Sequence, residues 1–244
     1  MPIPATRGDA RAGRACGRLI IAIDGPVGAG KSTVARLVAR RLGYRYINSG
    51  AMYRALAWKA LEVGFDQDDE EGARRLADAI SISLEPSGDR ELVLVDGQDV
   101  SRQIREQRVE QASSKLSTFA SVRRVMVARQ REMAAQGGVV MDGRDIGTVV
   151  FPDADVKFYL EARLEVRAKR RYLEAQVAGA PRSLEELSEE IKVRDARDMG
   201  RNASPLRRAD DAVTIDTSDL TALQVVDAME EKIRRRPMAS RGCE

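Results

Sequence analysis

The sequence of 244 residues contains no histidine. Histidine is the side chain whose charge most readily changes near neutral pH, and its imidazole is the most common metal ligand in proteins. A reaction that needs a histidine base, or a site that holds a metal through imidazoles, is therefore excluded. Any chemistry that this chain performs must use Lys, Arg, Asp, Glu and Ser side chains.

Cysteine and long apolar runs are also scarce. Only Cys16 and Cys243 are present, and they form neither a disulfide framework nor a zinc site of the usual ligand spacing. This usage favours a reducing, cytoplasmic location. No apolar stretch approaches the ~20 residues of a membrane-spanning helix, and 1–17 lacks the apolar segment of a signal peptide. We expect no membrane partner, a flexible basic tail at 1–17 and a second tail at 237–244.

Aromatic residues and net charge are low as well. Aromatic residues make up 4% of the chain, and 41 Lys and Arg residues face 38 Asp and Glu residues. A nucleic-acid groove normally combines a positive field with aromatic side chains for base stacking, so we expect no nucleic-acid partner. The hydrophobic content of 43% is sufficient for a substantial core in one large domain or in a core domain with insertions. We expect this protein to be a monomer.

A phosphate-binding motif is the strongest positive signal. Residues 25–32 fit G-x-x-x-x-G-K-S, follow an apolar run at 19–23 and precede a helical pattern. In such a P-loop, backbone N–H groups surround phosphate oxygens, Lys31 reaches the outer phosphates and Ser32 offers its hydroxyl to Mg²⁺. The following helix points its positive end at the anion. The residues expected to bind the triphosphate are Gly25, Pro26, Val27, Gly28, Ala29, Gly30, Lys31, Ser32 and Thr33.

Strand and helix patterns alternate along most of the chain. Gly43 is placed to end the helix after the P-loop, and a closing helix is expected from about Asp219. This alternation predicts an α/β fold with a mostly parallel sheet that helices cover on both sides. The expected strands are 19–23, 44–47, 139–141, 156–160 and 212–215.

Residues 65–110 interrupt this alternation. The segments 80–84 and 91–97 read as short antiparallel strands on either side of a Pro-Ser-Gly-Asp turn, which predicts an inserted β module. The acidic cluster at 66–71 is interpreted as a solvated loop and a helix start rather than a metal site.

Charged residues follow the strand expected at 139–141. Asp142 would lie at the carboxyl edge of the sheet beside the P-loop, where it could hold Mg²⁺ through water, although such an aspartate is also a common turn former. Arg144 and Asp145 come next. They could form an ion pair with each other, or both could contact a ligand.

Arginines cluster again in the last third of the chain. Arg194, Asp198 and Arg201 stand at i, i+4 and i+7, so on a helix they would share one face. This face is either a solvated set of ion pairs or a phosphate site. Gly200 favours a short helix that is held close to another group, rather than a long helix in solvent. Guanidinium groups suit phosphates because they donate two parallel hydrogen bonds. A similar stripe comprises Arg163, Arg167, Arg170 and Arg171.

Two further segments carry candidate residues. Ser49 could cap the helix after the strand at 44–47, and Arg54 lies more than one turn into that helix, from where it could point back to the phosphate cleft. Ser114 and Arg123 would face opposite ways on one unbroken helix. If both reach one ligand, the chain must bend between them.

Together these segments resemble the bacterial cytidylate (CMP) kinase family. The resemblance rests on D-G-P-V-G-A-G-K-S, N-S-G-A-M-Y-R, D-G-R-D-I-G-T-V-V-F-P-D-A and R-D-x-x-D-x-x-R-x-x-x-P-L, in this order, and covers the chain from Leu19 to about Arg236. It implies a P-loop NTPase core with a five-stranded parallel sheet, an inserted monophosphate-binding domain with a small antiparallel sheet, and a short mobile lid. The implied core is 18–64 and 126–236 with the lid at about 175–183, and the implied insert is 65–125.

The same resemblance implies roles for individual residues. The acceptor phosphate would be clamped by Arg54, Arg144 and Arg201. The ribose would contact Arg194 and Asp198, and the cytosine would be read by Ser114, Arg123 and Asp145. Ser49 and Asp142 would complete the CMP site, Arg167 and Arg171 would help to bind ATP, and Ser32 with Asp142 through water would hold Mg²⁺. The catalytic residues so implied are Lys31, Arg144, Arg194 and Arg201.

One feature departs from the family pattern. Many members have a proline between the residues that correspond to Phe119 and Arg123, where this chain has Ala-Ser-Val. A proline would supply the bend that brings Arg123 to the base. The reach of Arg123 is therefore an expectation that the structure must test.

The implied reaction is the transfer of the γ-phosphoryl group of Mg-ATP to CMP or dCMP, which gives CDP or dCDP and ADP. A phosphate monoester has a second pKa near ~6 and is largely a dianion at neutral pH, so no histidine base is needed. Another small-molecule kinase on the same core, for UMP, AMP or shikimate, is the nearest alternative. A P-loop GTPase or nucleic-acid-binding ATPase is the alternative from another class, but the N-K-x-D guanine signature is absent.

Overall fold

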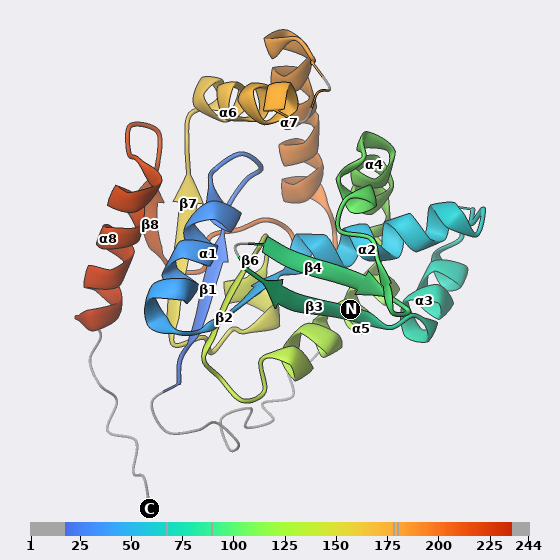
Figure 1. Cartoon of the computed structure of the whole chain (residues 1–244), viewed down its shortest axis with the longest axis horizontal. Coiled ribbons are helices and arrows are strands. Elements are labelled where there is room, and N and C mark those ends of the chain that lie inside the picture. Colours follow the sequence, from blue (N-terminus) through green and yellow to red (C-terminus); the bar gives the residue numbers. More distant parts are fainter. Residues whose placement is uncertain (1–17, 67, 89, 178, 180, 236–244) are drawn as a thin grey trace, which may run out of the picture.

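The computed structural model describes residues 18–66, 68–88, 90–177, 179 and 181–235 (Figure 1). The tails expected at 1–17 and 237–244, with Cys16 and Cys243, lie outside the described residues, as do two positions of the expected lid. A five-stranded parallel sheet forms the core, with the strand order β2-β6-β1-β7-β8. Its strands are β1 (Ile20–Asp24), β2 (Arg45–Asn48), β6 (Val139–Gly143), β7 (Val156–Glu161) and β8 (Val213–Asp216).

Helices cover both faces of this sheet because its strands are apolar on both sides. In β1, Ile21 and Ile23 pack in one apolar cluster with α1 (Lys31–Leu42) and α8 (Ala222–Arg234). Ile20 and Ala22 point the other way, into a cluster that includes α2 (Ser49–Glu62). The expected α/β fold with a parallel sheet is confirmed.

Two helices lie beyond the carboxyl ends of the central strands. They are α6 (Leu164–Val177) and α7 (Leu184–Gly200), which flank the expected lid (Figure 1). Between β6 and β7 the chain forms one π-helical turn, η2 (Ile146–Val150). The P-loop, η2 and these two helices therefore meet at one edge of the sheet, where parallel α/β folds place their ligands.

The inserted module consists of helices around a small antiparallel sheet with the order β3-β4-β5. The sheet is confirmed, although its strands differ by a few residues from 80–84 and 91–97. The expected boundary between 125 and 126 falls inside an unbroken helix, α5, whose Val122 and Met126 pack in the same cluster as β1. The elements of the module are α3 (Glu70–Ala79), β3 (Ile82–Ser87), β4 (Arg90–Val95), β5 (Gln98–Asp99), η1 (Gln103–Arg105), α4 (Gln107–Leu116) and α5 (Ala120–Met133).

The chain bends between α4 and α5 although it has no proline there. Helix α4 ends at Leu116, and Phe119 is extended, with φ −72° and ψ 120°. The backbone N–H and the hydroxyl of Ser121 donate to the Glu70 carboxylate at 3.1 Å and 2.7 Å, so Glu70 of α3 satisfies the first turn of α5. The bend that the sequence required for Ser114 and Arg123 to meet is therefore present.

Three local expectations are wrong. Ser49 does not cap α2, because Asn48 is the capping residue and its side chain accepts from the Ala51 N–H at 2.9 Å. Helix α7 is not short, since it has 17 residues. The closing helix begins at Ala222 rather than near Asp219, because Thr221 and Gln224 form a capping box.

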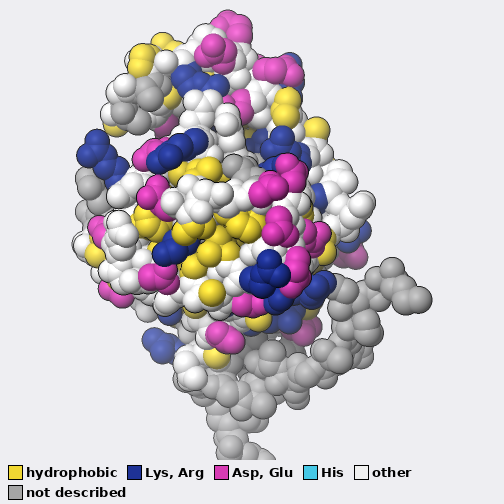
Figure 2. All heavy atoms as spheres, turned by 90° about the vertical axis from the view of Figure 1, so that its right-hand side faces the viewer, with side chains coloured by type: hydrophobic (Ala, Val, Ile, Leu, Met, Phe, Trp, Pro, Cys, Tyr) yellow, Lys and Arg dark blue, Asp and Glu magenta, His cyan; other side chains and the backbone are white. Residues whose placement is uncertain are grey.

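The outer surface combines charge and apolar side chains. The face on the right-hand side of Figure 1 has an apolar strip surrounded by acidic and basic side chains (Figure 2). Among the described residues, no helix is both long and apolar enough to cross a bilayer.

Candidate active site

The P-loop connects the end of β1 to the start of α1 and depends on glycine. Gly25, Gly28 and Gly30 have φ values of +149°, +78° and +85°, which side chains with a Cβ rarely adopt. At Gly25 a Cβ would also lie 2.0 Å from the carbonyl oxygen of Leu160 on β7. Close packing between the loop and the sheet therefore holds the backbone N–H groups in place.

Replacement of Gly25 by alanine tests this packing. We expect Gly25→Ala to lower the free energy of unfolding by about 3 kcal/mol or more, because the Cβ would collide with backbone rather than with a side chain that can move. Urea denaturation of the ligand-free protein measures this loss. Gly64→Ala is the matched control for left-handed strain alone, since Gly64 has φ +64° and open space around it. Equal losses in the two variants would contradict the packing argument.

Lys31 is a buried cation at the first position of α1. Its Nζ donates to the carbonyl oxygen of Pro26 at 2.6 Å. Burial lowers its pKa well below the usual range, and the neighbouring Arg144 adds to this effect, whereas Asp142 and Asp24 oppose it. A cation held among other cations at a helix N-terminus favours an incoming anion. Ser32 lies in the same first turn, and Thr33 is exposed.

Oxygen atoms suitable for Mg²⁺ meet beside the P-loop. Ser32 Oγ donates to Asp142 Oδ2 at 2.7 Å, and the Tyr46 hydroxyl donates to Asp142 Oδ1 at 2.8 Å. Ser49 Oγ donates to the main-chain oxygen of Asp142 at 2.6 Å and so fixes the end of β6. A hydroxyl and a carboxylate are hard oxygen donors, which is the ligand type that Mg²⁺ prefers. The expected pair, Ser32 and Asp142, fits this ion.

Arg144, Asp198 and Arg201 form one ion-pair cluster across the cleft. Arg144 Nε donates to Asp198 Oδ2 at 2.8 Å, and Arg201 Nη1 lies 3.7 Å from Asp198 Oδ1. Burial would raise the pKa of Asp198, but the guanidinium groups of Arg144, Arg201 and Arg194 outweigh burial and lower it. The carboxylate fixes both arginines, and Arg201 Nη2, which is buried without a partner, stays available for an anion.

Two of the residues expected to read the base, Arg123 and Asp145, meet as an ion pair. Arg123 Nη2 donates to Asp145 Oδ2, and both side chains are about 5% exposed. The Arg123 guanidinium lies 5.3 Å from the centre of the Tyr53 ring, and its Nη1 donates to the Ser117 carbonyl at 3.1 Å. The third, Ser114 of α4, has a different partner, because its hydroxyl accepts from Arg197 Nη1 at 2.7 Å.

Several polar atoms around this pair have no partner. Among the described residues, Tyr53 Oη, Arg123 Nε and Arg201 Nη2 are buried and make no hydrogen bond. Burial raises the pKa of Tyr53 to about 12, so its hydroxyl is a donor. Unpaired buried polar groups destabilise a protein unless a ligand or water satisfies them. The space beside Asp145 is therefore suited to a polar ligand.

Three more arginines surround an acidic residue of the module. Arg171 Nη2 of α6 lies 2.8 Å from Glu110 Oε2, and Arg194 Nη1 of α7 lies 3.7 Å from the same oxygen. Arg54 of α2 is close enough to lower the pKa of Glu110, and burial lowers the pKa of Arg54 itself. Arg54, Arg171 and Arg194 therefore converge on a carboxylate. The family resemblance implies a different target for each of them, the acceptor phosphate, ATP and the ribose, and these contacts stay predictions.

Arg167 is directed differently from what the sequence suggests. Its guanidinium donates to the carbonyl oxygens of Val27 at 3.1 Å and Ala162 at 3.0 Å, and it pairs with Asp195. The next arginine of the stripe, Arg170, donates to the Gly28 carbonyl at 3.3 Å. Both side chains support the backbone of the P-loop, so a direct contact between Arg167 and ATP stays a prediction.

Sequence reasoning missed other residues of the site. Asp24 accepts hydrogen bonds from the N–H groups of Ile146 at 2.8 Å and Gly147 at 2.7 Å, and burial raises its pKa to about 7. It ties the P-loop to the turn that carries Asp145. Two of the missed residues lie inside motifs that carry the family resemblance: Asp24 is the first residue of D-G-P-V-G-A-G-K-S, and Tyr53 belongs to N-S-G-A-M-Y-R. No pattern pointed to Glu110.

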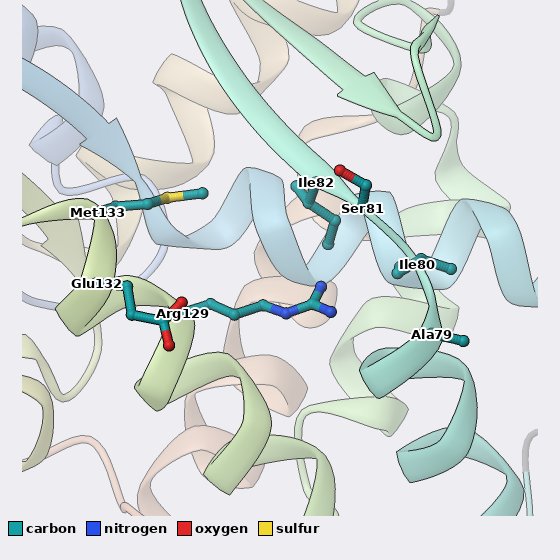
Figure 3. A pocket seen from close by; sticks show the side chains of 7 residues that line it. All are labelled: Ala79, Ile80, Ser81, Ile82, Arg129, Glu132 and Met133. Carbon is teal, nitrogen blue, oxygen red and sulfur yellow. The ribbon is translucent and has the colours of Figure 1, made fainter.

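A separate hollow of about 380 Å³ lies where the end of α3 and the start of β3 face α5 (Figure 3). Its lining residues include Ala79 of α3, Ser81 of the following connection, Ile82 of β3, and Arg129 and Met133 of α5. It contains none of the residues expected to bind nucleotide or metal. The cleft between the P-loop and the module, rather than this hollow, is the candidate active site.

A P-loop whose lysine and serine face a set of converging arginines belongs to an ATP-dependent phosphotransferase. The finer class follows from comparison: the cytidylate kinase family model matches residues 21–235, and the chain belongs to this family. It is 51% identical over 219 residues to the cytidylate kinase of Geobacillus thermodenitrificans (strain NG80-2), which covers 90% of this chain and 98% of that protein. It is 45% identical over 218 residues to that of Geobacter sp. (strain M21), with 89% and 94% covered.

Solved structures of more distant proteins also align. A shikimate kinase from Acinetobacter baumannii in complex with shikimate covers 91% of this chain and 96% of that chain, with a TM-score of 0.45 and 16% identity. A gluconokinase from Sinorhizobium meliloti 1021 covers 90% and 94%, with a TM-score of 0.47 and 14% identity. At this distance the alignments carry no argument about substrate.

Proposed function

We propose that this protein transfers the γ-phosphoryl group of Mg-ATP to CMP, and also to dCMP. The observation that carries the proposal is the buried Asp145 carboxylate, which faces unpartnered donors within reach of the arginine cluster at Asp198. Membership of the cytidylate kinase family supports the same substrate. Asp145 accepts the exocyclic amino group of cytosine, whereas uracil would set a carbonyl oxygen against the carboxylate.

The chain's own residues supply binding, orientation and charge. Lys31 and the P-loop N–H groups hold the phosphates of ATP, and Arg54, Arg144 and Arg201 hold the acceptor phosphate in line with them. The acceptor is already largely a dianion at neutral pH, so no residue has to remove a proton. Mg²⁺ would be held by Ser32 and, through water, by Asp142, and it would supply neutralisation of the phosphate charge.

A coupled ADP-release assay with purified protein tests this function. CMP and dCMP should each stimulate ADP formation strongly, and UMP, AMP, GMP and shikimate should stimulate it much less. Strong stimulation by AMP or shikimate, with none by CMP, would favour the alternative kinases on this core and would reject the proposal.

The selectivity for cytosine should depend on Asp145. We expect Asp145→Asn to lower the ratio of kcat/KM for CMP to kcat/KM for UMP by about 10- to 100-fold, because the NH2 group of the amide repels the amino group of cytosine and can donate to the carbonyl oxygen of uracil. The ratio is measured on one preparation, so it does not depend on the folded fraction. Asp153→Asn, at an exposed position on the following segment, is the control and should leave the ratio unchanged. An unchanged ratio in Asp145→Asn would remove this residue from base recognition.

The monomeric state and the cytoplasmic location stay predictions from the sequence.

A further inference from the structure

Glu110 connects two parts of the molecule that lie on opposite sides of the cleft. It stands in the first turn of α4, and its Oε2 lies 2.8 Å from Arg171 of α6 and 3.7 Å from Arg194 of α7. Its side chain is 18% exposed, and those of the two arginines are 24% and 20% exposed. Figure 1 shows α4 beside α7, and the hydrogen bond between Ser114 and Arg197 joins the same two helices.

The surroundings of Glu110 resemble those of a bound phosphate. Three guanidinium groups act on its carboxylate, from Arg171, Arg194 and Arg54. Arg144 lies close to Arg194 and repels it, which lowers the pKa of Arg194 together with burial. Without an anion these like charges would be held at short range in a poorly solvated cleft, which costs free energy. The carboxylate compensates them in the ligand-free protein.

We propose that Glu110 is an internal competitor of the substrate phosphates: its carboxylate occupies the arginines of α6 and α7 until a nucleotide phosphate replaces it. This inference rests on the proposed function in that Arg171 helps to bind ATP, and it assigns Arg194, which the family resemblance places at the ribose, to a nucleotide phosphate as well. A phosphate displaces the carboxylate because it brings more negative charge and more acceptor oxygens to the same fork.

In this role Glu110 is a positioning residue. Its carboxylate weakens nucleotide binding, whereas the arginines strengthen it. The free energy of the Glu110 ion pairs is lost when a nucleotide binds, so it is subtracted from the affinity. In return, the arginines stay oriented and the module stays connected to α6 and α7 before substrate arrives. Removal of the carboxylate should therefore tighten binding, whereas removal of a residue that merely supports the site would weaken it.

Calorimetric titration of the full chain with a non-hydrolysable ATP analogue and Mg²⁺ tests the proposal. We expect Glu110→Gln to lower the dissociation constant about three- to tenfold, the range of a partly buried ion pair. Glu174→Gln is the matched control, because Glu174 pairs with the same Arg171 at 3.3 Å but from one turn along α6, and it is exposed. It should change the dissociation constant less than twofold.

Three further measurements complete the test. In an Arg171→Gln background the effect of Glu110→Gln should shrink, since one of the paired cations is gone. Glu110→Asp, which withdraws the carboxylate by one methylene, should give an intermediate dissociation constant if Glu110→Gln does not fold. In steady-state assays KM for ATP should fall while kcat does not rise in proportion.

Equal or weaker binding of the analogue by folded Glu110→Gln or Glu110→Asp would overturn the proposal. Because the titration contains no CMP, this outcome is distinct from a failure of the proposed function. A protein that does not phosphorylate CMP but binds the analogue more tightly without the Glu110 carboxylate would keep the inference and lose the substrate assignment.

Discussion

Lys31→Ala should reduce kcat with CMP by about 100- to 1,000-fold or more, the usual loss when one preorganised donor to a developing negative charge is removed. Lys31 lies at the start of α1 with its Nζ 2.6 Å from the Pro26 carbonyl, at the point where the P-loop directs its N–H groups. No other lysine of the described chain lies in the P-loop or its first helical turn. Initial rates at saturating CMP and ATP measure the effect.

The fold should survive this substitution. The charged form of Lys31 is penalised by burial and by Arg144, so its folded-state pKa is lower than that of the unfolded chain. Below the unfolded-state pKa, this difference favours the unfolded state, so the loss of the buried charge by itself should not destabilise the protein. The thermal midpoint of Lys31→Ala should be close to that of the parent chain, and Lys31→Met, which keeps the apolar stem, should match it more closely. Near-normal turnover in either variant would count against the mechanism.

Arg144→Ala should also reduce kcat with CMP by at least about 100-fold. Its guanidinium lies between Lys31 and Asp198, so it is placed to compensate both the transferred group and the acceptor. Arg144→Lys should recover only a small part of the rate, because an ammonium keeps the charge but not the two parallel donors. Quenched-flow measurement of a single turnover separates this chemical step from product release.

A matched arginine shows whether the loss is local. Arg124→Ala, at an exposed position on α5 and outside the cluster at Asp198, removes the same charge from the protein and should leave kcat within about twofold. Similar losses in Arg124→Ala and Arg144→Ala would mean that overall charge, rather than position, determines the rate.

Local sequence patterns were sufficient for the core and for the P-loop. The apolar run before Gly25 predicts a strand, and the helical spacing of apolar residues after Lys31 predicts a helix. Both signals can be recognised without knowledge of the rest of the chain. The bend between Ser114 and Arg123 was also predictable, because nine residues on one straight helix cannot place both side chains on one ligand. Its cause was not, since it depends on Glu70, which lies 51 positions from Ser121.

Contacts between distant segments account for what the sequence could not reveal. Arg167 belongs to an arginine stripe that suggested a phosphate contact, but its partners, Val27 and Asp195, come from two other elements. Ser49 and Asn48 are both good capping residues, and only the register of β2 decides between them. Glu110 stands among ordinary helical residues in the sequence. Its partners, Arg171 and Arg194, come from α6 and α7, so its contacts are known only from the folded structure.

Transfer of ³²P from [γ-³²P]ATP to CMP, with the products separated by chromatography, tests the central claim most directly. If two nucleotides meet in this cleft, the label appears in CDP in proportion to the ADP formed, and Lys31→Ala abolishes the labelled CDP. Label that appears in inorganic phosphate while CMP stays unlabelled would contradict the account.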